Sequence, residues 1–214
     1  MRYEIIQTQP YKDALFMLQK SSGEDIGTAV RIKKRNNGFN GFEVDFLDYH
    51  IRMKFMGSLW FRWKNRLKNR IKFWSPSGNA ICYFFQNGIK YGELCKYSNG
   101  TYLMRLNGQT YTMCTVGFGK EGIKFPVFEG EFKNVATQGK QIALIETPNL
   151  GLKTNNYQVA ALGEWEGLVA ALYGIYVDYV TFSISDSYYR KTYLETFDRQ
   201  NSLYDPAFKG QIVD

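Results

Sequence analysis

Residues 163–184 read GEWEGLVAALYGIYVDYVTFSI, and the rest of the chain is best interpreted around this stretch. Eleven uncharged residues lie between Glu166 and Asp178, so a helix here carries apolar side chains on every face. Such a helix is buried either in protein or in lipid. A bilayer needs about 20 residues, and an extension to Ile184 places Asp178 in the hydrocarbon. The stretch therefore predicts a buried central helix at about 164–179, although periodicity alone leaves a continuous apolar strand open.

The composition is typical of a soluble globular protein. The chain has 214 residues, of which 17% are aromatic and 22% charged, which favours one domain rich in strands with a thick core. The N-terminal residues lack the apolar region of a signal peptide. Cys82, Cys95 and Cys114 are widely spaced, without a Cys-x-x-Cys motif, so we expect buried free thiols in a reducing compartment. The expected location is cytoplasmic, with peripheral attachment to a membrane as an extension of that expectation.

The positive charge of the chain is unevenly distributed. The formal net charge is +7. Residues 1–76 contain 15 Lys or Arg and 7 Asp or Glu, whereas the remaining residues contain 12 and 13. All of the excess positive charge therefore lies in the first third, which suggests a basic face and an anionic partner.

Strand patterns dominate the first 150 residues. Three Asn-Gly pairs, at residues 87–88, 99–100 and 107–108, separate apolar-rich segments and predict type I′ hairpin turns. The segment GFGKEG and the residues around Pro126 are expected between strands. The predicted strands are Arg2–Gln7, Ala14–Gln19, Ile26–Lys33, Phe42–Phe46, Ile51–Phe55, Ala80–Gln86, Ile89–Lys96, Thr101–Leu106, Thr110–Val116, Glu129–Phe132 and Gln141–Glu146.

These elements together predict a closed barrel. An open antiparallel sheet of this size curls or closes, and closure removes the exposed strand edges. A helix that is apolar on all faces is buried most simply inside the closed barrel, because a surface groove covers only part of it. The fold class expected is therefore mainly β, a closed antiparallel β-barrel of about 12 strands around a buried hydrophobic helix. Residues 1–184 form this domain, and residues 185–214 are a C-terminal extension.

Two stretches resemble the tubby C-terminal-like superfamily, which includes LURP-one-related proteins and phospholipid scramblases. Lys72–Ile81, KFWSPSGNAI, is similar to a strand–turn–Gly element of that superfamily, and Leu168–Val180, LVAALYGIYVDYV, is similar to its central helix. The resemblance covers about residues 2–184 and implies a twelve-stranded barrel and a link to phospholipids. Ser75 replaces an acidic turn residue that is frequent in relatives, and residues 185–214 continue beyond the expected end of the barrel. No phosphoinositide-binding motif of the family is legible here.

The strongest functional candidate is Leu59–Trp74, LWFRWKNRLKNRIKFW. Cations at every second position line one face of a strand, whereas in a helix a stripe flanked by cations is formed by Trp60, Trp63, Leu67, Ile71 and Trp74. Both structures fit. The pattern predicts a surface that binds anionic lipid or phosphate, although a solvated face of a basic protein also explains it. The expected anion-binding residues are Arg62, Lys64, Arg66, Lys68, Arg70 and Lys72, and the expected interface aromatics are Trp60, Trp63 and Trp74.

Residues that could carry catalysis or bind a metal are sparse. His50 is the only histidine, and nothing near it suggests a nucleophile–base arrangement, so we expect no enzyme and no cofactor. Zinc needs clustered ligands, and Glu43, Asp45 and Asp48 lack the spacing of a calcium loop. GFGKEG resembles a phosphate loop only superficially because no helix follows.

Two smaller features complete the pattern. Asp178 directly follows the apolar stretch and is expected to cap or pair inside the barrel. In the extension, Tyr189, Tyr193 and Phe197 recur every fourth residue, which predicts a short amphipathic helix on the barrel exterior.

The favoured hypothesis is a non-enzymatic module that associates with anionic membrane surfaces or phospholipids. A nucleic-acid-binding protein that uses residues 59–74 is an alternative. Another is a small-ligand barrel resembling lipocalins, in which the helix lies outside and the interior is open.

Overall fold

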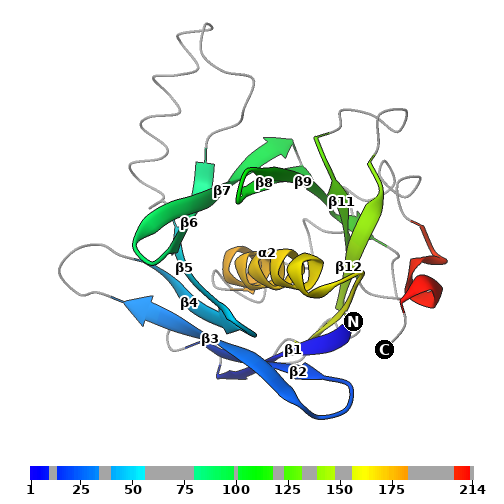
Figure 1. Cartoon of the computed structure of the whole chain (residues 1–214), viewed down its shortest axis with the longest axis horizontal. Helices are drawn as coiled ribbons and strands as arrows, with labels where there is room; N and C mark the ends of the chain where they lie inside the picture. Colours follow the sequence, from blue (N-terminus) through cyan, green and yellow to red (C-terminus); the bar gives the residue numbers. More distant parts are fainter. Residues whose placement is uncertain are drawn as a thin grey trace, which may run out of the picture.

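A ring of antiparallel strands surrounds one long helix in the computed structural model of the chain (Figure 1). The structure describes residues 1–9, 14–33, 40–55, 80–98, 101–117, 123–131, 139–147, 156–182 and 205–212. Within these residues the helical elements are α2 (Glu164–Phe182) and the 3-10 helix η5 (Phe208–Gln211). The strands are β1 (Arg2–Gln9), β2 (Leu15–Lys20), β3 (Asp25–Lys33), β4 (Asn40–Phe46), β5 (Tyr49–Phe55), β6 (Ala80–Gln86), β7 (Ile89–Ser98), β8 (Thr101–Leu106), β9 (Gln109–Cys114), β10 (Val116–Gly117), β11 (Ile123–Glu129), β12 (Gln141–Thr147) and β13 (Asn156–Ala161).

The strands form one antiparallel sheet that closes on itself. Strands β1 to β9 follow one another around the ring, β1 also pairs with β13, and β13 continues through β12 to β11. Pairing of β11 with β9 closes the ring, so twelve strands form the barrel and the short β10 extends the β9 side of β11. At the seam between β1 and β13, the N-terminal ammonium of Met1 donates a 2.7 Å hydrogen bond to the carbonyl of Ala161. The predicted fold class is confirmed.

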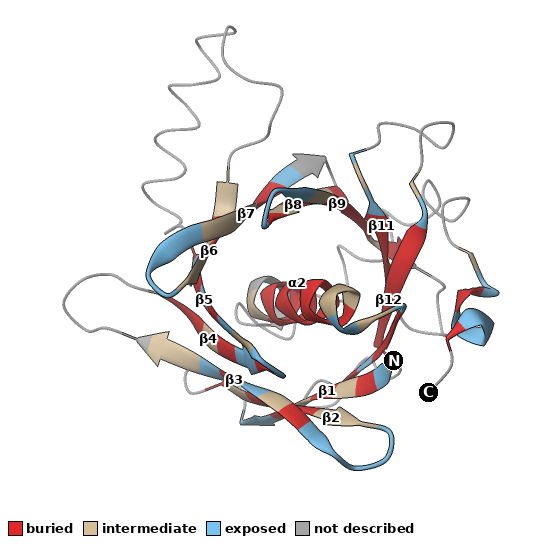
Figure 2. Ribbon diagram, viewed as in Figure 1, coloured by how far each residue is buried: buried red, intermediate tan, exposed pale blue. Residues whose placement is uncertain are grey.

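The alternation of side chains along each strand separates the interior from the exterior. In β5, Ile51, Met53 and Phe55 are buried toward the interior, whereas Arg52 and Lys54 are exposed. This is the two-residue period expected of a strand with one buried face. Figure 2 shows the same change from buried to exposed residues around the ring.

Two of the predicted Asn-Gly turns close hairpins. Asn87 has φ of 50° with 78° at Gly88, and Asn107 has 49° with 76° at Gly108. Positive φ at both central residues is the requirement of a type I′ turn, which Asn and Gly meet at low cost. The third pair, at residues 99–100, lies outside the described residues.

Two strands differ from the sequence-based prediction. The predicted strand Glu129–Phe132 is wrong, because β11 covers Ile123–Glu129 and ends there. Pro126 lies inside β11, between the residues that pair with β10 and the residues that pair with β9. Neither strand needs a backbone N–H at this position, so proline breaks no hydrogen bond of the sheet there. Strand β13 was not predicted at all, although it completes the ring between β12 and β1.

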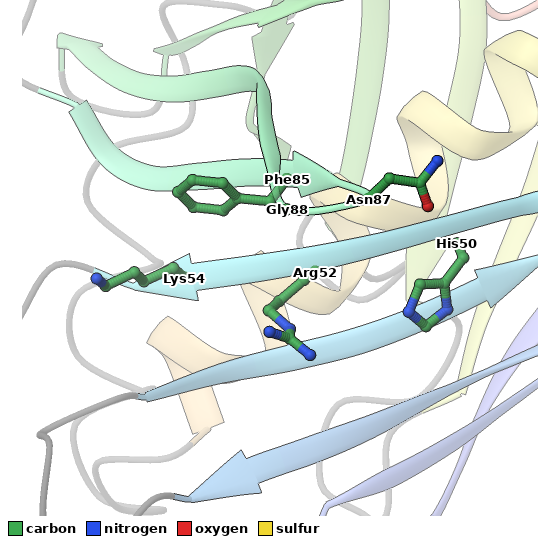
Figure 3. Close-up of a pocket in the computed structure, with 6 residues that line it drawn as sticks. All are labelled: His50, Arg52, Lys54, Phe85, Asn87 and Gly88. Atoms are coloured by element: carbon green, nitrogen blue, oxygen red, sulfur yellow. The ribbon is translucent and has the colours of Figure 1, made fainter.

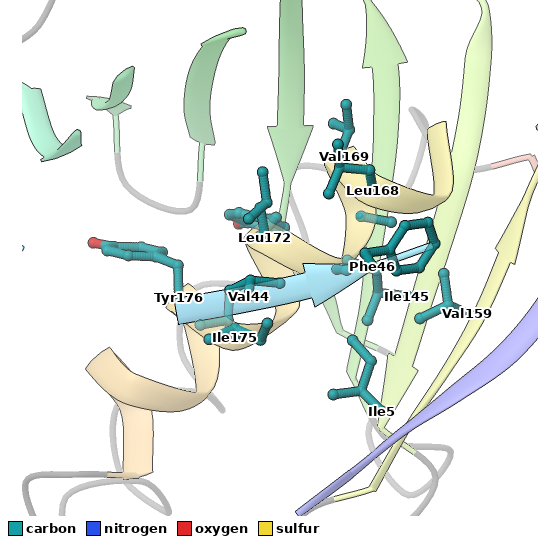
Figure 4. Packing of buried hydrophobic residues seen from close by; sticks show 14 of the residues in the cluster. Ile5, Val44, Phe46, Ile145, Val159, Leu168, Val169, Leu172, Ile175 and Tyr176 are labelled. Atoms are coloured by element: carbon teal, nitrogen blue, oxygen red, sulfur yellow. The ribbon is translucent and has the colours of Figure 1, made fainter. Parts of the chain in front are cut away.

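The interior of the barrel is filled by α2. Leu168, Val169, Leu172 and Ile175 all have 0% exposure, and they pack with inward side chains of the strands around them (Figure 4). Gly174 makes room for a side chain, because a Cβ there would lie 2.9 Å from Cδ1 of Ile5. The central helix predicted from the apolar stretch is therefore confirmed, and it runs to Phe182.

The two ends of the barrel differ. At one, which we call the turn end, short turns join β2 to β3, β4 to β5, β6 to β7 and β8 to β9. Here α2 begins, and Nε1 of Trp165 donates to Oε1 of Gln109 and to the hydroxyl of Tyr111, at 2.9 and 2.5 Å. At the opposite, connection end, α2 leaves the lumen, and Tyr179 stacks on Phe55 with ring centroids 4.1 Å apart.

Residues 205–212 lie outside the barrel next to β12. Phe208 and Ile212 are buried there against Leu144 and Ala160. The part of the extension for which an amphipathic helix was predicted, Tyr189 to Phe197, lies outside the described residues.

Candidate functional site

Two segments that join strands at the connection end are rich in Lys and Arg. Residues 34–39 join β3 to β4, and residues 56–79 join β5 to β6; together they contain eight Lys or Arg and no Asp or Glu. Because β3 to β6 are consecutive neighbours in the ring, both connections start and finish at four adjacent strand ends. The topology thus attaches two acid-free basic segments to one sector of the barrel rim.

The residues predicted to bind anions fall within the longer of these connections. Arg62, Lys64, Arg66, Lys68, Arg70 and Lys72 lie outside the described residues, as do Trp60, Trp63 and Trp74. Whether 59–74 is a helix or a strand therefore stays a prediction. What the structure adds is the position of the strands that flank this stretch.

Described residues at the same rim link a cation to the end of α2. The guanidinium of Arg31 on β3 lies over the ring of Tyr179, 5.0 Å from its centroid, and donates a 3.3 Å hydrogen bond to Oδ1 of Asn40. Asn40 in turn donates to the hydroxyl of Tyr179. Cation–π contact and these hydrogen bonds hold the rim of β3 and β4 on the last turns of the helix.

A shallow groove lies on the outer face of β5 and opens at the turn end of the barrel. The ladder between β5 and β6 covers only Arg52 to Phe55, and beyond it the two strands separate. A pocket of about 410 Å³ opens there, lined by a row of basic side chains on β5 and by the end of β6 with its turn (Figure 3). Its lining residues are His50, Arg52, Lys54, Phe85, Asn87 and Gly88.

Acidic residues of β4 partly compensate the charge of this groove. Arg52 donates from Nε and Nη2 to Oε1 of Glu43, at 3.1 and 2.5 Å. Nδ1 of His50 lies 2.5 Å from Oδ1 of Asp45. These pairs are largely exposed, so each contributes little to stability. The sequence predicted that Arg52 and Lys54 lie on the same face of a strand. It did not predict that Phe85 lies beside Arg52, because this depends on the register between β5 and β6.

The residues considered for catalysis or metal binding are engaged in other contacts. His50 faces solvent and pairs with Asp45, and Glu43 binds Arg52. Among the described residues no group of three or more His, Cys, Asp or Glu is arranged to hold a metal ion.

The three cysteines are free and buried. Burial raises the pKa of Cys114 to about 12, although a hydrogen bond with Thr101 opposes this. Burial also raises the pKa of Cys95 to about 11, with Glu93 adding to the effect. These environments stabilise the protonated thiols.

A polar cluster lies inside the barrel near the connection end. Asp178 of α2 has 4% exposure, and its carboxylate accepts hydrogen bonds from the hydroxyl of Tyr157 and from Nε2 of Gln7, at 2.9 and 3.3 Å. The prediction that Asp178 pairs inside the barrel is confirmed. Hydrogen bonds of this kind allow a buried polar group to be accommodated in an otherwise apolar core.

Among the described residues, α2 fills the lumen at its own level. The helix is buried from Gly167 to Asp178, which is the opposite of the open interior that a lipocalin-like barrel requires. None of the helices that the structure describes is long and apolar enough to span a membrane.

Comparison of the chain with protein-family models, curated proteins and solved structures finds no match.

Proposed function

We propose that the protein is a non-enzymatic binding module that attaches to anionic membrane surfaces or phospholipids through the connection end of its barrel. One observation carries this proposal: the two acid-free basic connections, with eight Lys or Arg, are attached to adjacent strands β3 to β6. A Lys or Arg near an anionic leaflet contributes about 1 kcal/mol, so a cluster of this size supplies enough attraction for peripheral binding.

Two further observations support a surface site. The lumen is occupied by α2, so a ligand has to be bound on the outside of the barrel at this level. The groove of Arg52, Lys54 and Phe85 also lies on the outside of the barrel and combines cations with an aromatic side chain, although its walls include the β6–β7 turn at the turn end. The resemblance of Leu168–Val180 to the central helix of tubby-like proteins agrees with a lipid-associated role.

Sedimentation with vesicles tests the proposal. The change is Arg62, Lys64, Arg66 and Lys68 to Ser, which we expect to weaken binding to phosphatidylserine vesicles at low salt. The effect should shrink at high salt, because the Debye length falls from about 10 Å at 0.1 M to about 3 Å at 1 M. Insertion of Trp60, Trp63 or Trp74 into the interface predicts a blue shift of tryptophan fluorescence on binding.

A control variant has the same loss of net charge away from the proposed surface. Four cations nearer the turn end are replaced with Ser, and vesicle binding should remain close to that of the unaltered protein. Equal loss of binding in both variants would show that binding depends only on the net charge of the protein, and it would contradict a binding surface located at the connection end. Tighter binding to single-stranded DNA than to the vesicles would favour the nucleic-acid alternative. The control positions are Lys20, Lys90, Arg105 and Lys140.

A further inference from the structure

Residues 205–212, which we call the strap, occupy an outer groove of the barrel with few anchors. Phe208 and Ile212 have 1% and 5% exposure and pack on Leu144 of β12 and Ala160 of β13. The side chains of Pro206, Ala207, Lys209 and Gln211 are exposed. An aromatic residue and an aliphatic residue four positions later therefore supply the apolar contact.

Polar groups of the barrel recognise the backbone and the charge of the strap. Nη2 of Arg2 donates to the carbonyls of Lys209 and Ile212, at 3.0 and 3.2 Å. The ammonium of Lys209 pairs with Glu146, which also pairs with Lys124 at 3.3 Å. Recognition of main-chain carbonyls and of one cation does not depend on the remaining side chains, so other segments with this pattern fit the same contacts.

The strap is held separately from the barrel ladder. Its described bonds from backbone to backbone are internal, from Phe208 to Asp205, from Gly210 to Ala207 and from Ile212 to Lys209, and its backbone bonds to the barrel involve only side chains of the barrel. Strands β12 and β13 meanwhile pair with each other and with β11 and β1. Release of the strap therefore breaks no ladder bond, which is the condition for local opening without global unfolding.

The strap leaves the groove incompletely satisfied. A pocket of about 310 Å³ lies beside it, between Arg2, Glu4, Gln158 and Lys209. Gln141 is 8% exposed; its Oε1 accepts from the backbone N–H of Asp205 at 3.3 Å, but its Nε2 has no hydrogen-bond partner within the described part of the chain. A buried donor without a partner is unfavourable, so a segment that brings a carbonyl to this position gains a contact that the strap does not make.

We propose that the groove over β12, β13 and β1 is a docking surface for a segment of a partner protein, and that the strap covers it in cis. The partner segment has an aromatic residue, an aliphatic residue four positions later and a Lys or Arg between them. The aromatic and aliphatic side chains take the places of Phe208 and Ile212, the cation pairs with Glu146, and Arg2 binds the segment's carbonyls. Displacement of the strap is then the regulated step.

A labelled peptide with the sequence of residues 205–214, DPAFKGQIVD, tests the proposal on the full chain. In the variant Phe208→Ala/Ile212→Ala the strap is released, and we expect the peptide to bind at least tenfold more tightly than it binds the unaltered chain, whose strap competes at high effective concentration. A peptide in which Phe and Ile are replaced by Ala should not bind. Adding Arg2→Gln to the released variant should weaken binding of the unaltered peptide, because two carbonyl contacts are lost.

The matched control variant changes exposed strap residues, Pro206→Ala/Gln211→Ala, and should bind the peptide as weakly as the unaltered chain. A released variant with native circular dichroism that fails to bind the peptide, or that binds the Ala peptide equally well, overturns the proposal. Dimers of the unaltered chain that exchange straps would make a second copy the occupant and overturn a separate partner.

Hydrogen exchange on the unaltered chain covers the case in which the released variant does not fold. The amides of Gly210 and Ile212 should exchange faster than those of Leu144 and Ile145 in β12. Exchange of both sets only through global unfolding would show that the strap is a fixed part of the core and would overturn the proposal.

Discussion

The hydroxyl of Tyr157 on β13 donates a 2.9 Å hydrogen bond to the carboxylate of Asp178 on α2, inside the barrel. This bond links the last strand of the ring to the helix within it, and Gln7 of β1 donates to the other carboxylate oxygen. One buried carboxylate therefore connects three elements at the connection end.

Removal of the hydroxyl in Tyr157→Phe should destabilise the protein. The substitution keeps the ring but leaves a buried acceptor with one hydrogen bond fewer, at a cost of about 1.5–3 kcal/mol in the free energy of unfolding. Urea denaturation measures the change. Tyr83→Phe, on the outer face of β6, is the control and should change the free energy by less than about 0.5 kcal/mol. Equal effects in the two variants would show that the bond to Asp178 is not important for stability.

Leu172→Asp should prevent folding. Leu172 has 0% exposure in a helix that is packed on all sides, so the substitution buries a charge without a designed partner. Circular dichroism and thermal melting of the purified variant measure the effect. Leu162→Asp is a control with the same chemical change at 38% exposure, and it should fold normally. A cooperatively melting Leu172→Asp protein would contradict the packing of α2.

Glu93 should contribute to the loss of stability in acid. Burial raises the pKa of Glu93, but the bonds from Lys90 and Arg105, at 2.8 and 3.2 Å, outweigh burial and hold the pKa below the ordinary value of a glutamate side chain. A lowered folded-state pKa means that the contribution is present above the unfolded-state pKa and is lost as the pH falls through the folded-state pKa. The free energy of unfolding, measured by urea denaturation from about pH 6 to 3, should therefore decline less steeply in Glu93→Gln.

A partner variant checks the origin of this pH dependence. Lys90→Gln/Arg105→Gln removes the cations that lower the pKa of Glu93, so its acid limb should resemble that of Glu93→Gln. If the free energy of unfolding of both variants fell with pH as steeply as that of the unaltered protein, the pH dependence would belong to other carboxyl groups.

The cysteines should resist alkylation in the folded protein. Burial raises the pKa of Cys95 to about 11 and that of Cys114 to about 12, and burial also raises the pKa of Cys82. Since the thiolate is the reactive form, iodoacetamide at pH 8 should label none of them quickly. Mass spectrometry should detect three additions after denaturation in guanidinium. Rapid labelling of one site in the folded protein would show that this thiol is accessible.

The barrel could be predicted because two of the patterns that specify it each lie within a short stretch of the sequence. The apolar residues from Leu168 to Val177 are consecutive, and the Asn-Gly pairs at 87–88 and 107–108 specify turns on their own. Strand β13 lacks this kind of signal, because its outward positions near the seam are covered: Ala160 packs under Phe208, so NYQVAA does not alternate between polar and apolar residues to its end. Strand β11 was missed because it contains Pro126. Proline is acceptable there only because it lies between the residues of β11 that pair with β10 and those that pair with β9.

The candidate surface was predictable in composition but not in position. The basic residues of 56–79 form a cluster that the sequence shows, but the attachment of this segment and of 34–39 to neighbouring strands follows from the order of β3 to β6 around the ring. The contacts of Arg2 with the strap join residues more than 200 positions apart, and no periodicity reports a contact of that range.

The seam between β1 and β13 also has a consequence for synthesis of the chain. Met1 and Ala161, which are joined by a hydrogen bond, are 160 residues apart, and α2 follows β13 in the chain. At translation rates of about 5–20 residues per second, β1 emerges from the ribosome roughly 8–30 s before β13, with which it pairs in the folded protein. Throughout that interval the nascent sheet has two open edges and an apolar inner face without its helix. The inward side chains of the early strands therefore stay exposed on the nascent chain until α2 has been made.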